Sequence, residues 1–296
     1  MALPVPPHVL KELSARSDAR GLVHLLGHLT AIGAAMTLVL AARGTAPVWP
    51  AMAVLGVLEV ALFAPLHETT HRTPFRSLWL NRVVGWLAGF VLLLPPEWFR
   101  LFHLAHHRHT QNPAQDPEIQ GARPLTRGRY LLILTGGPYW LAQVQVLLRH
   151  AAGRSKEPWI PLASRPAVIR EARAYLVAYA LLLTASLATG STLALFLWLV
   201  PVLLGQPVLR AVLLAEHKGL PLTANRLANT RTTLAGRLLA LLFWNANFHT
   251  EHHLAPGVPF HALPKLHALV RPHLAALERS YPAAHRSIRA GLAAKG

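Results

Sequence analysis

Nine of the 18 histidines in this 296-residue chain stand in three short clusters and at one isolated position. Neutral imidazole binds iron, zinc, copper and nickel, and a catalytic zinc ion takes only about three protein ligands. The supply of imidazoles therefore favours a site for two metal ions. The clusters are His67–Glu–Thr–Thr–His71, His103–Leu–Ala–His106–His107 and His249–Thr–Glu–His252–His253, and the isolated residue is His217.

The spacing within each cluster suits a helix. Residues three or four apart share a helix face, so His67 and His71 can hold one metal or flank two. By the same spacing, each triplet is expected to present its three imidazoles toward a common point. His217 follows Glu216 at the end of an apolar segment and is predicted to be a further ligand. The remaining histidines are not expected to be ligands, and His109 is predicted to point elsewhere.

Acidic residues near the clusters are candidates to accept the second N–H of a metal-bound imidazole. They are Glu68, Asp116, Glu216 and Glu251. The polar stretch 229–233 is a candidate for orienting ligands, with ordinary capping as the alternative. Glu59 lies inside an apolar segment, where a carboxylate is costly and usually functional or paired; a role in a substrate tunnel and a bond to another helix are both open.

The composition indicates a membrane protein. Hydrophobic residues make up 53% of the chain and charged residues only 14%, against roughly 25% in soluble domains. The absence of cysteine excludes disulfides and thiolate metal sites. The net charge of +17 belongs to basic residues interspersed with apolar segments, which favours a basic membrane face over a nucleic-acid-binding surface.

Four segments have the length of membrane-spanning helices, which need about 20 apolar residues. They are residues 21–42, 48–66, 174–190 and 193–214, and short turns join them into two hairpins. The weaker apolar runs 83–94 and 130–148 are predicted to lie at the interface or to cap a core. Gly136–Gly–Pro138 interrupts the second run.

This arrangement puts both termini and all nine histidines on one side of the membrane. Arg43 is the only lysine or arginine in the connecting segments of the opposite side, so the positive-inside rule makes the histidine side cytoplasmic. Residues 1–20 are charged and do not resemble a cleavable signal peptide. The sequence thus predicts one all-α integral membrane domain, residues 1–296, whose cytoplasmic helical cap (67–173 and 215–296) carries a di-metal site.

At this point the sequence resembles the membrane fatty acid desaturase superfamily. The resemblance rests on the three histidine boxes and the two hairpins, with His217 at the place of that family's additional ligand. It implies a di-iron centre held by the nine histidines, O2 as cosubstrate, and removal of hydrogen from an unactivated C–H bond of a lipid or acyl chain. No catalytic side chain beyond the metal ligands and no organic cofactor is implied.

The resemblance leaves the reaction partly open. A haem-binding segment of the cytochrome b5 type does not occur in the sequence, so an external electron donor, a ferredoxin or a cytochrome b5 type protein, is expected. Hydroxylases and ketolases of lipids, carotenoids or small metabolites share similar boxes and are the alternative. A metal transporter is a remote alternative, since an ion path needs ligands near the midplane and on both faces.

Overall fold

Four helical stretches in the structure, a computed structural model that describes residues 5–120 and 125–293, are long and apolar enough to cross a membrane. They are Asp18–Ala41, Val48–His71, Leu162–Thr189 and Leu195–His217. Each covers one predicted segment, although the boundaries differ. The third begins about three turns before residue 174, because α9 (Arg165–Thr189) starts with an amphipathic part that buries Val168 and Ala172 and carries charged residues between them.

The centre of the fold is the packing of α3 (Val48–Val60) against α10 (Val200–His217). The two backbones touch at a pair of glycines. A Cβ at Gly56 would lie 1.8 Å from the carbonyl oxygen of Pro201, and a Cβ at Gly205 would lie 2.1 Å from that of Gly56. Any side chain at either position would push the helices apart, and α10 carries His217 at its end.

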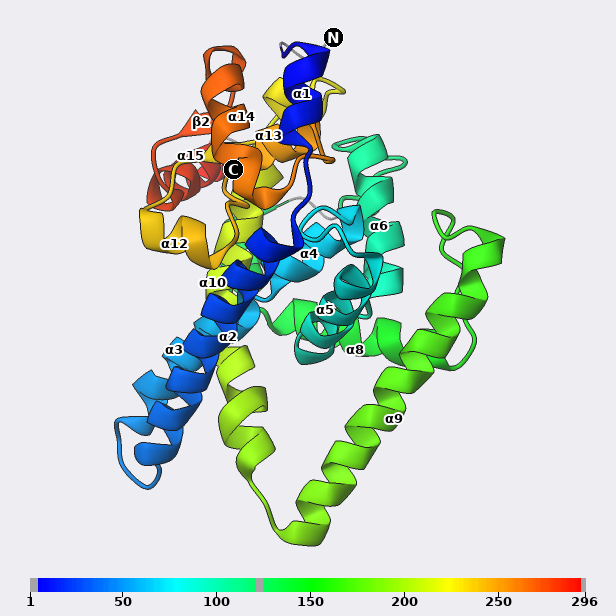
Figure 1. The fold of residues 1–296 in the computed structure, drawn as a ribbon, viewed down its shortest axis with the longest axis vertical. Coiled ribbons are helices and arrows are strands. Elements are labelled where there is room, and N and C mark those ends of the chain that lie inside the picture. Colours follow the sequence, from blue (N-terminus) through cyan, green and yellow to red (C-terminus); the bar gives the residue numbers. More distant parts are fainter. Residues whose placement is uncertain (1–4, 121–124, 294–296) are drawn as a thin grey trace.

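The helices α2 (Asp18–Ala41) and α3 lie side by side, whereas α9 and α10 diverge from their shared turn (Figure 1). The helix α9 packs instead on α8 (Gly137–Ala151) and α6 (Pro96–His109). Only 11% of its apolar window is buried within the described chain. Leu181, Leu183 and Leu187 are among the exposed side chains, which suits a helix surrounded by lipid.

The two weaker apolar runs form bent helix pairs. The helices α5 (Leu78–Val91) and α6 meet at 98°, and α7 (Arg127–Leu134) and α8 meet at 65°. The second bend falls where the sequence predicted an interruption, at Gly136, whose φ of +76° is in the left-handed region that glycine adopts most easily. Each pair together has the length and composition of a broken span or a re-entrant segment.

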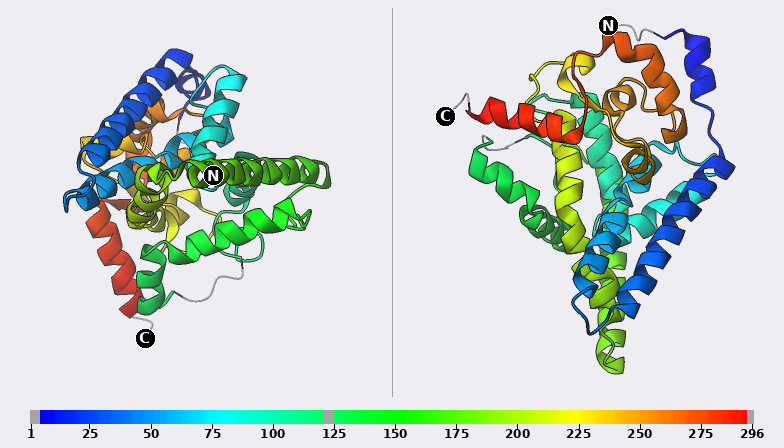
Figure 2. Two further views of the ribbon diagram at one scale, coloured as in Figure 1. Left: turned by 90° about the horizontal axis from the view of Figure 1, so that it is seen from below. Right: turned by 90° about the vertical axis from the view of Figure 1, so that its left-hand side faces the viewer.

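Most of the remaining elements lie at the end of the molecule away from the α2–α3 and α9–α10 turns (Figures 1 and 2). Two short strands, β1 (Thr232–Thr233) and β2 (Leu277–Glu278), pair in parallel there. The other elements are α1 (Pro7–Leu13), α4 (Phe63–His71), η1 (Leu162–Ser164), the π-helical η2 (Leu195–Leu199), α11 (Arg226–Asn229), α12 (Arg237–Leu242), α13 (His249–Leu254), η3 (Phe260–Ala262), α14 (Leu263–Val270), η4 (Arg271–His273) and α15 (Tyr281–Ala293).

Candidate metal centre

The nine predicted histidines gather in two adjacent groups supplied by α4, α6, α10 and α13. Within each group, one ligand atom from every residue lies within 4.8 Å of the others. All nine residues except His71 are buried. The first histidine group is His67, His71, His103, His107 and His252, and the second histidine group is His106, His217, His249 and His253.

Each triplet divides between the two groups, so the expectation of a common point for three imidazoles is wrong. An α-helix turns by about 100° per residue, so positions i and i+4 differ by about 40°, while consecutive positions differ by about 100°. His103 and His107 therefore join one group and His106 the other. In the same way, His249 and His253 separate from His252. Two groups side by side are the result.

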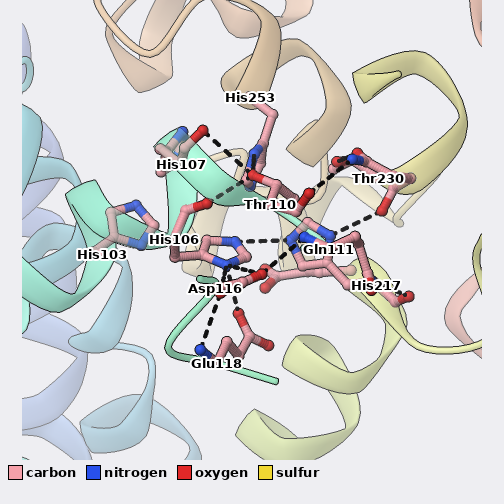
Figure 3. Close-up of polar contacts among 12 residues, drawn as sticks. His103, His106, His107, Thr110, Gln111, Asp116, Glu118, His217, Thr230 and His253 are labelled. Carbon is pink, nitrogen blue, oxygen red and sulfur yellow. Dashed lines mark hydrogen bonds and ion pairs between the residues drawn. The ribbon is translucent and has the colours of Figure 1, made fainter. Parts of the chain in front are cut away.

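A carboxylate pair holds the ring of His106 (Figure 3). Both oxygens of Asp116 lie 3.0–3.1 Å from His106 Nδ1, and Glu118 Oε2 lies 3.2 Å from the same atom. Asp116 is almost fully buried and also accepts the backbone N–H of Gln111 at 2.8 Å. A carboxylate accepts but does not donate, so Nδ1 of His106 carries hydrogen and its Nε2 presents a lone pair.

The other members of the second histidine group have the same orientation. Thr110 gives its hydroxyl hydrogen to the carbonyl of His106 at 2.8 Å, so its oxygen is free to accept from His253. Nδ1 of His217 lies 3.1 Å from the carbonyl oxygen of Asn229, and Nδ1 of His253 lies 3.2 Å from Thr110 Oγ1. Nδ1 of His249 lies 3.4 Å from Glu216 Oε1 but forms no hydrogen bond among the described residues.

Four Nε2 lone pairs consequently face one another in the second histidine group. The Nε2–Nε2 distances are 3.2 Å for His106–His217, 3.0 Å for His217–His249 and 3.1 Å for His249–His253. Lone pairs at this distance repel unless a cation lies among them. Nitrogens bound to one ion at about 2.1 Å are about 3 Å apart when adjacent, so the arrangement fits a metal ion.

The first histidine group has matching distances. Nε2 of His71 lies 2.9 Å from that of His103, and Nε2 of His107 lies 3.1 Å from that of His252. Nε2 of His67 is buried and has no hydrogen-bond partner in the part of the chain that the structure describes. Buried polar atoms are rarely left without a partner, and a metal would supply one.

Burial keeps the imidazoles on α13 in the form that binds metals. It lowers the pKa of His252 and His253 well below the ordinary value, and the neighbouring imidazoles add to this effect. Desolvation disfavours the charged form of a histidine. Both rings are therefore neutral near pH 7, as metal ligation requires.

Two of the four predicted carboxylate partners are wrong. Glu68 binds Thr73 Oγ1 at 2.8 Å and the N–H of Phe260 at 3.1 Å, and touches no member of either group. Glu251 contacts His267 at 2.6 Å and so supports α13 from behind. Neither His267 nor Glu118 was predicted as a partner, because neither is adjacent to a histidine box.

Other residues singled out in the sequence have separate roles. His109 lies outside both groups, as predicted. The 229–233 stretch does approach the site, through Asn229 and through Thr232, whose hydroxyl donates to Glu251 at 2.5 Å. Glu59 is buried, and its Oε2 has no hydrogen-bond partner among the described residues.

A cavity of about 360 Å³ adjoins both groups. Four of the clustered histidines line it: His67, His103, His106 and His249. Phe99 and Phe102 of α6 are among its aromatic lining residues. A substrate in this histidine-lined cavity would therefore lie directly beside any metal held by the histidines.

Comparison with known proteins places these features in a family. The family profile described as "Fatty acid desaturase" matches residues 44–285. The sn-1 oleoyl-lipid 12-desaturase of Picosynechococcus sp. is 25% identical over 249 residues, and the dihydrorhizobitoxine desaturase of Bradyrhizobium elkanii is 28% identical over 241 residues. These matches cover 76% and 73% of this chain, and 68% and 65% of the respective relatives.

A shorter match also occurs. The sn-1 acyl-lipid omega-3 desaturase (ferredoxin) of Nostoc sp. is 29% identical over 96 residues, which are 29% of this chain and 26% of that protein. The chain thus spans about two thirds of the length of the two relatives with the broadest matches. The profile match covers most of the chain and includes both histidine groups. The chain belongs to the fatty acid desaturase family.

Proposed function

We propose that this membrane oxidoreductase is a dioxygen-dependent di-iron enzyme that desaturates an acyl chain, with the nine histidines as its iron ligands. The observation that carries the proposal is the convergence of four Nε2 lone pairs in the second histidine group. Imidazole suits iron, and a redox metal fits a family of oxidoreductases. The chain acts as one domain over residues 1–296.

When bound, the iron pair supplies the activation of dioxygen and the oxidising power to remove hydrogen from an unactivated C–H bond. The chain's own residues hold the substrate and orient the ligand histidines. Asp116 and the carbonyl of Asn229 fix the ring orientation of their histidines, as partners of metal-bound imidazoles do. The histidine-lined cavity holds the target carbons beside the site and limits access of water.

The membrane arrangement that we propose has two hairpins and a cytoplasmic helical cap. The four apolar stretches would span the bilayer, and residues 67–173 and 215–296 would carry the site and the C-terminus on the cytoplasmic side together with the N-terminus. The turns on the other side of the membrane, residues 43–47 and 191–192, contain only one basic residue, Arg43, and this scarcity supports the arrangement. Cysteine-accessibility labelling of Arg43→Cys in intact cells tests this arrangement, since residue 43 should react from outside.

Electrons would come from a separate protein, a ferredoxin or a cytochrome b5 type protein. The chain has 29 lysines and arginines against 12 acidic residues, and a basic face favours encounter with an acidic donor. The name of the Nostoc relative includes ferredoxin. Reduction by each purified donor can be compared at low and high salt, because steering between charged surfaces weakens with ionic strength.

Mass-spectrometric profiling of lipids and free acids tests the reaction itself. The host is a desaturase-deficient strain that expresses the chain, with His252→Ala as the control. New double bonds that are absent from the control support the proposal and give the bond position. Hydroxylated or ketonic products would show that the enzyme is a hydroxylase or a ketolase and not a desaturase. Unchanged profiles from an iron-replete protein would overturn the assignment to acyl chains.

A further inference from the structure

Part of the lining of the histidine-lined cavity is charged. Three cations contribute to it: Arg129 of α7, Arg210 of α10, and Lys218, which follows α10. Two acidic residues, Glu118 and Glu216, line the same cavity. The cations therefore outnumber the acidic groups by one, a surplus that a purely apolar acyl chain does not need.

The acidic groups of this lining lie beside histidines, whereas the cations form no ion pairs. Glu118 lies 3.2 Å from His106 Nδ1 and Glu216 lies 3.4 Å from His249 Nδ1. Among the residues that the structure describes, none of the three cations forms an ion pair. Each cation is therefore available to an anionic ligand.

Arg210 is the best placed of the three. Its Nε donates to Gln206 Oε1 at 2.9 Å, and its guanidinium lies 4.0 Å from the centre of the Tyr139 ring. These contacts fix the plane of the side chain and leave Nη2 buried without a partner in the described structure. Nη1 of Arg129 is in the same situation. Arginine within an apolar span is costly and usually serves a ligand or a pathway.

We propose that Arg210 and Arg129 bind the carboxylate of an amphipathic acid, so that the substrate enters as a free acid and not as the acyl chain of a phospholipid. This inference rests on the proposed function and specifies its substrate class. The guanidinium fork matches a carboxylate. A monoanion matches the surplus of one cation, whereas a phosphate dianion would bring a second negative charge close to the acidic side chain of Glu118.

The lining of the cavity agrees with an amphiphile, because apolar and charged side chains border the same space of about 360 Å³. Phe99 and Phe102 offer apolar surface for the hydrocarbon part, and the clustered histidines line the same space.

Equilibrium binding to the purified full chain, with its metals, tests the proposal. The probes are octanoate, methyl octanoate and mono-octyl phosphate, and metal content is measured on the same samples. Octanoate should bind at least tenfold more tightly than methyl octanoate, since a charge-assisted hydrogen bond is lost in the ester. Arg210→Gln and Arg129→Gln should each weaken octanoate binding about tenfold. Arg82→Gln, an exposed arginine outside this cavity, is the matched control and should bind as the wild type does.

Each contrary result identifies what failed. Equal binding of octanoate and its methyl ester, or wild-type binding by both arginine variants, overturns the carboxylate site. Preferential binding of mono-octyl phosphate overturns the choice of carboxylate over phosphate. A wild-type protein that binds octanoate but contains no iron would contradict the proposed function and leave the carboxylate site intact.

Discussion

Replacing Asp116 with asparagine tests whether the protein holds a metal in the second histidine group through the ring of His106. The carboxylate contacts His106 Nδ1 with both oxygens and accepts the N–H groups of Gln111 at 2.8 Å and Glu118 at 3.0 Å. Asparagine has the same shape but no charge and only one acceptor oxygen. The amide NH2 then faces His106 Nδ1 as a second donor, and the backbone N–H of either Gln111 or Glu118 loses its acceptor.

The size of the effect follows from these contacts. A hydrogen bond to a charged group contributes roughly 1.5–3 kcal/mol, and about 1.4 kcal/mol corresponds to a tenfold change in affinity. Asp116→Asn should therefore weaken one of two metal sites by about 10–100-fold, in the range found for partners of metal-bound histidines. The other site should change little, because Asp116 contacts no member of the first histidine group.

The assay is a titration of the purified protein with a competing chelator, with iron per chain measured at each step. The wild type should release two ions over a narrow range of chelator, and Asp116→Asn should release one of them much earlier. Glu68→Gln is the control, since Glu68 is equally buried but binds Thr73 and Phe260. Two ions held by Asp116→Asn with wild-type affinity would refute the role assigned to this carboxylate.

Three further predictions concern the fold and the ligands. Gly205→Val should prevent α3 from packing on α10, because even a Cβ there would lie 2.1 Å from the Gly56 carbonyl oxygen. The unfolding temperature and the expression level should fall sharply. Gly33→Val is the control and should be tolerated, because Gly33 has open space around it. His252→Ala should lose iron and turnover but still insert in membranes, whereas His109→Ala should keep both; an iron-replete, active His252→Ala protein would contradict the ligand assignment. Removing metal with a chelator should lower the unfolding temperature, since bound ligand stabilises the native state; an unchanged temperature would show that the facing lone pairs need no cation.

The chemistry of the site could be predicted from the sequence better than its geometry. The histidine types and spacings indicate nine ligands, and the structure brings these nine together. The sequence also gives the angle between His106 and His107 on their helix, about 100°. It does not show which neighbouring helix faces each ring. The division into two groups depends on how α4, α6, α10 and α13 approach one another, which is tertiary information.

Proximity in sequence was a poor guide to the carboxylates around the ligands. Glu68 lies between His67 and His71 in the sequence but points toward Thr73 and Phe260. Glu118 lies 11 residues after His107, and the loop after α6 returns it to His106. A helix sends consecutive residues in different directions, whereas a loop can bring a distant carboxylate back. The start of α9 was also placed too late. A hydropathy average does not detect helical turns that are amphipathic, as the first turns of α9 are.

The helix α10 carries residues of both parts of the proposed site. Gly205 sets it against α3, Arg210 lines the histidine-lined cavity, and His217 belongs to the second histidine group. Arg210 and His217 are seven residues apart, nearly two full turns, so their Cα atoms lie on one face about 10 Å apart along the axis. An acid held at Arg210 would therefore be positioned by the same helix that carries a metal ligand. The oxidised carbon would then be selected by its distance from the carboxylate, and a change in chain length at the far end would leave its position unaltered.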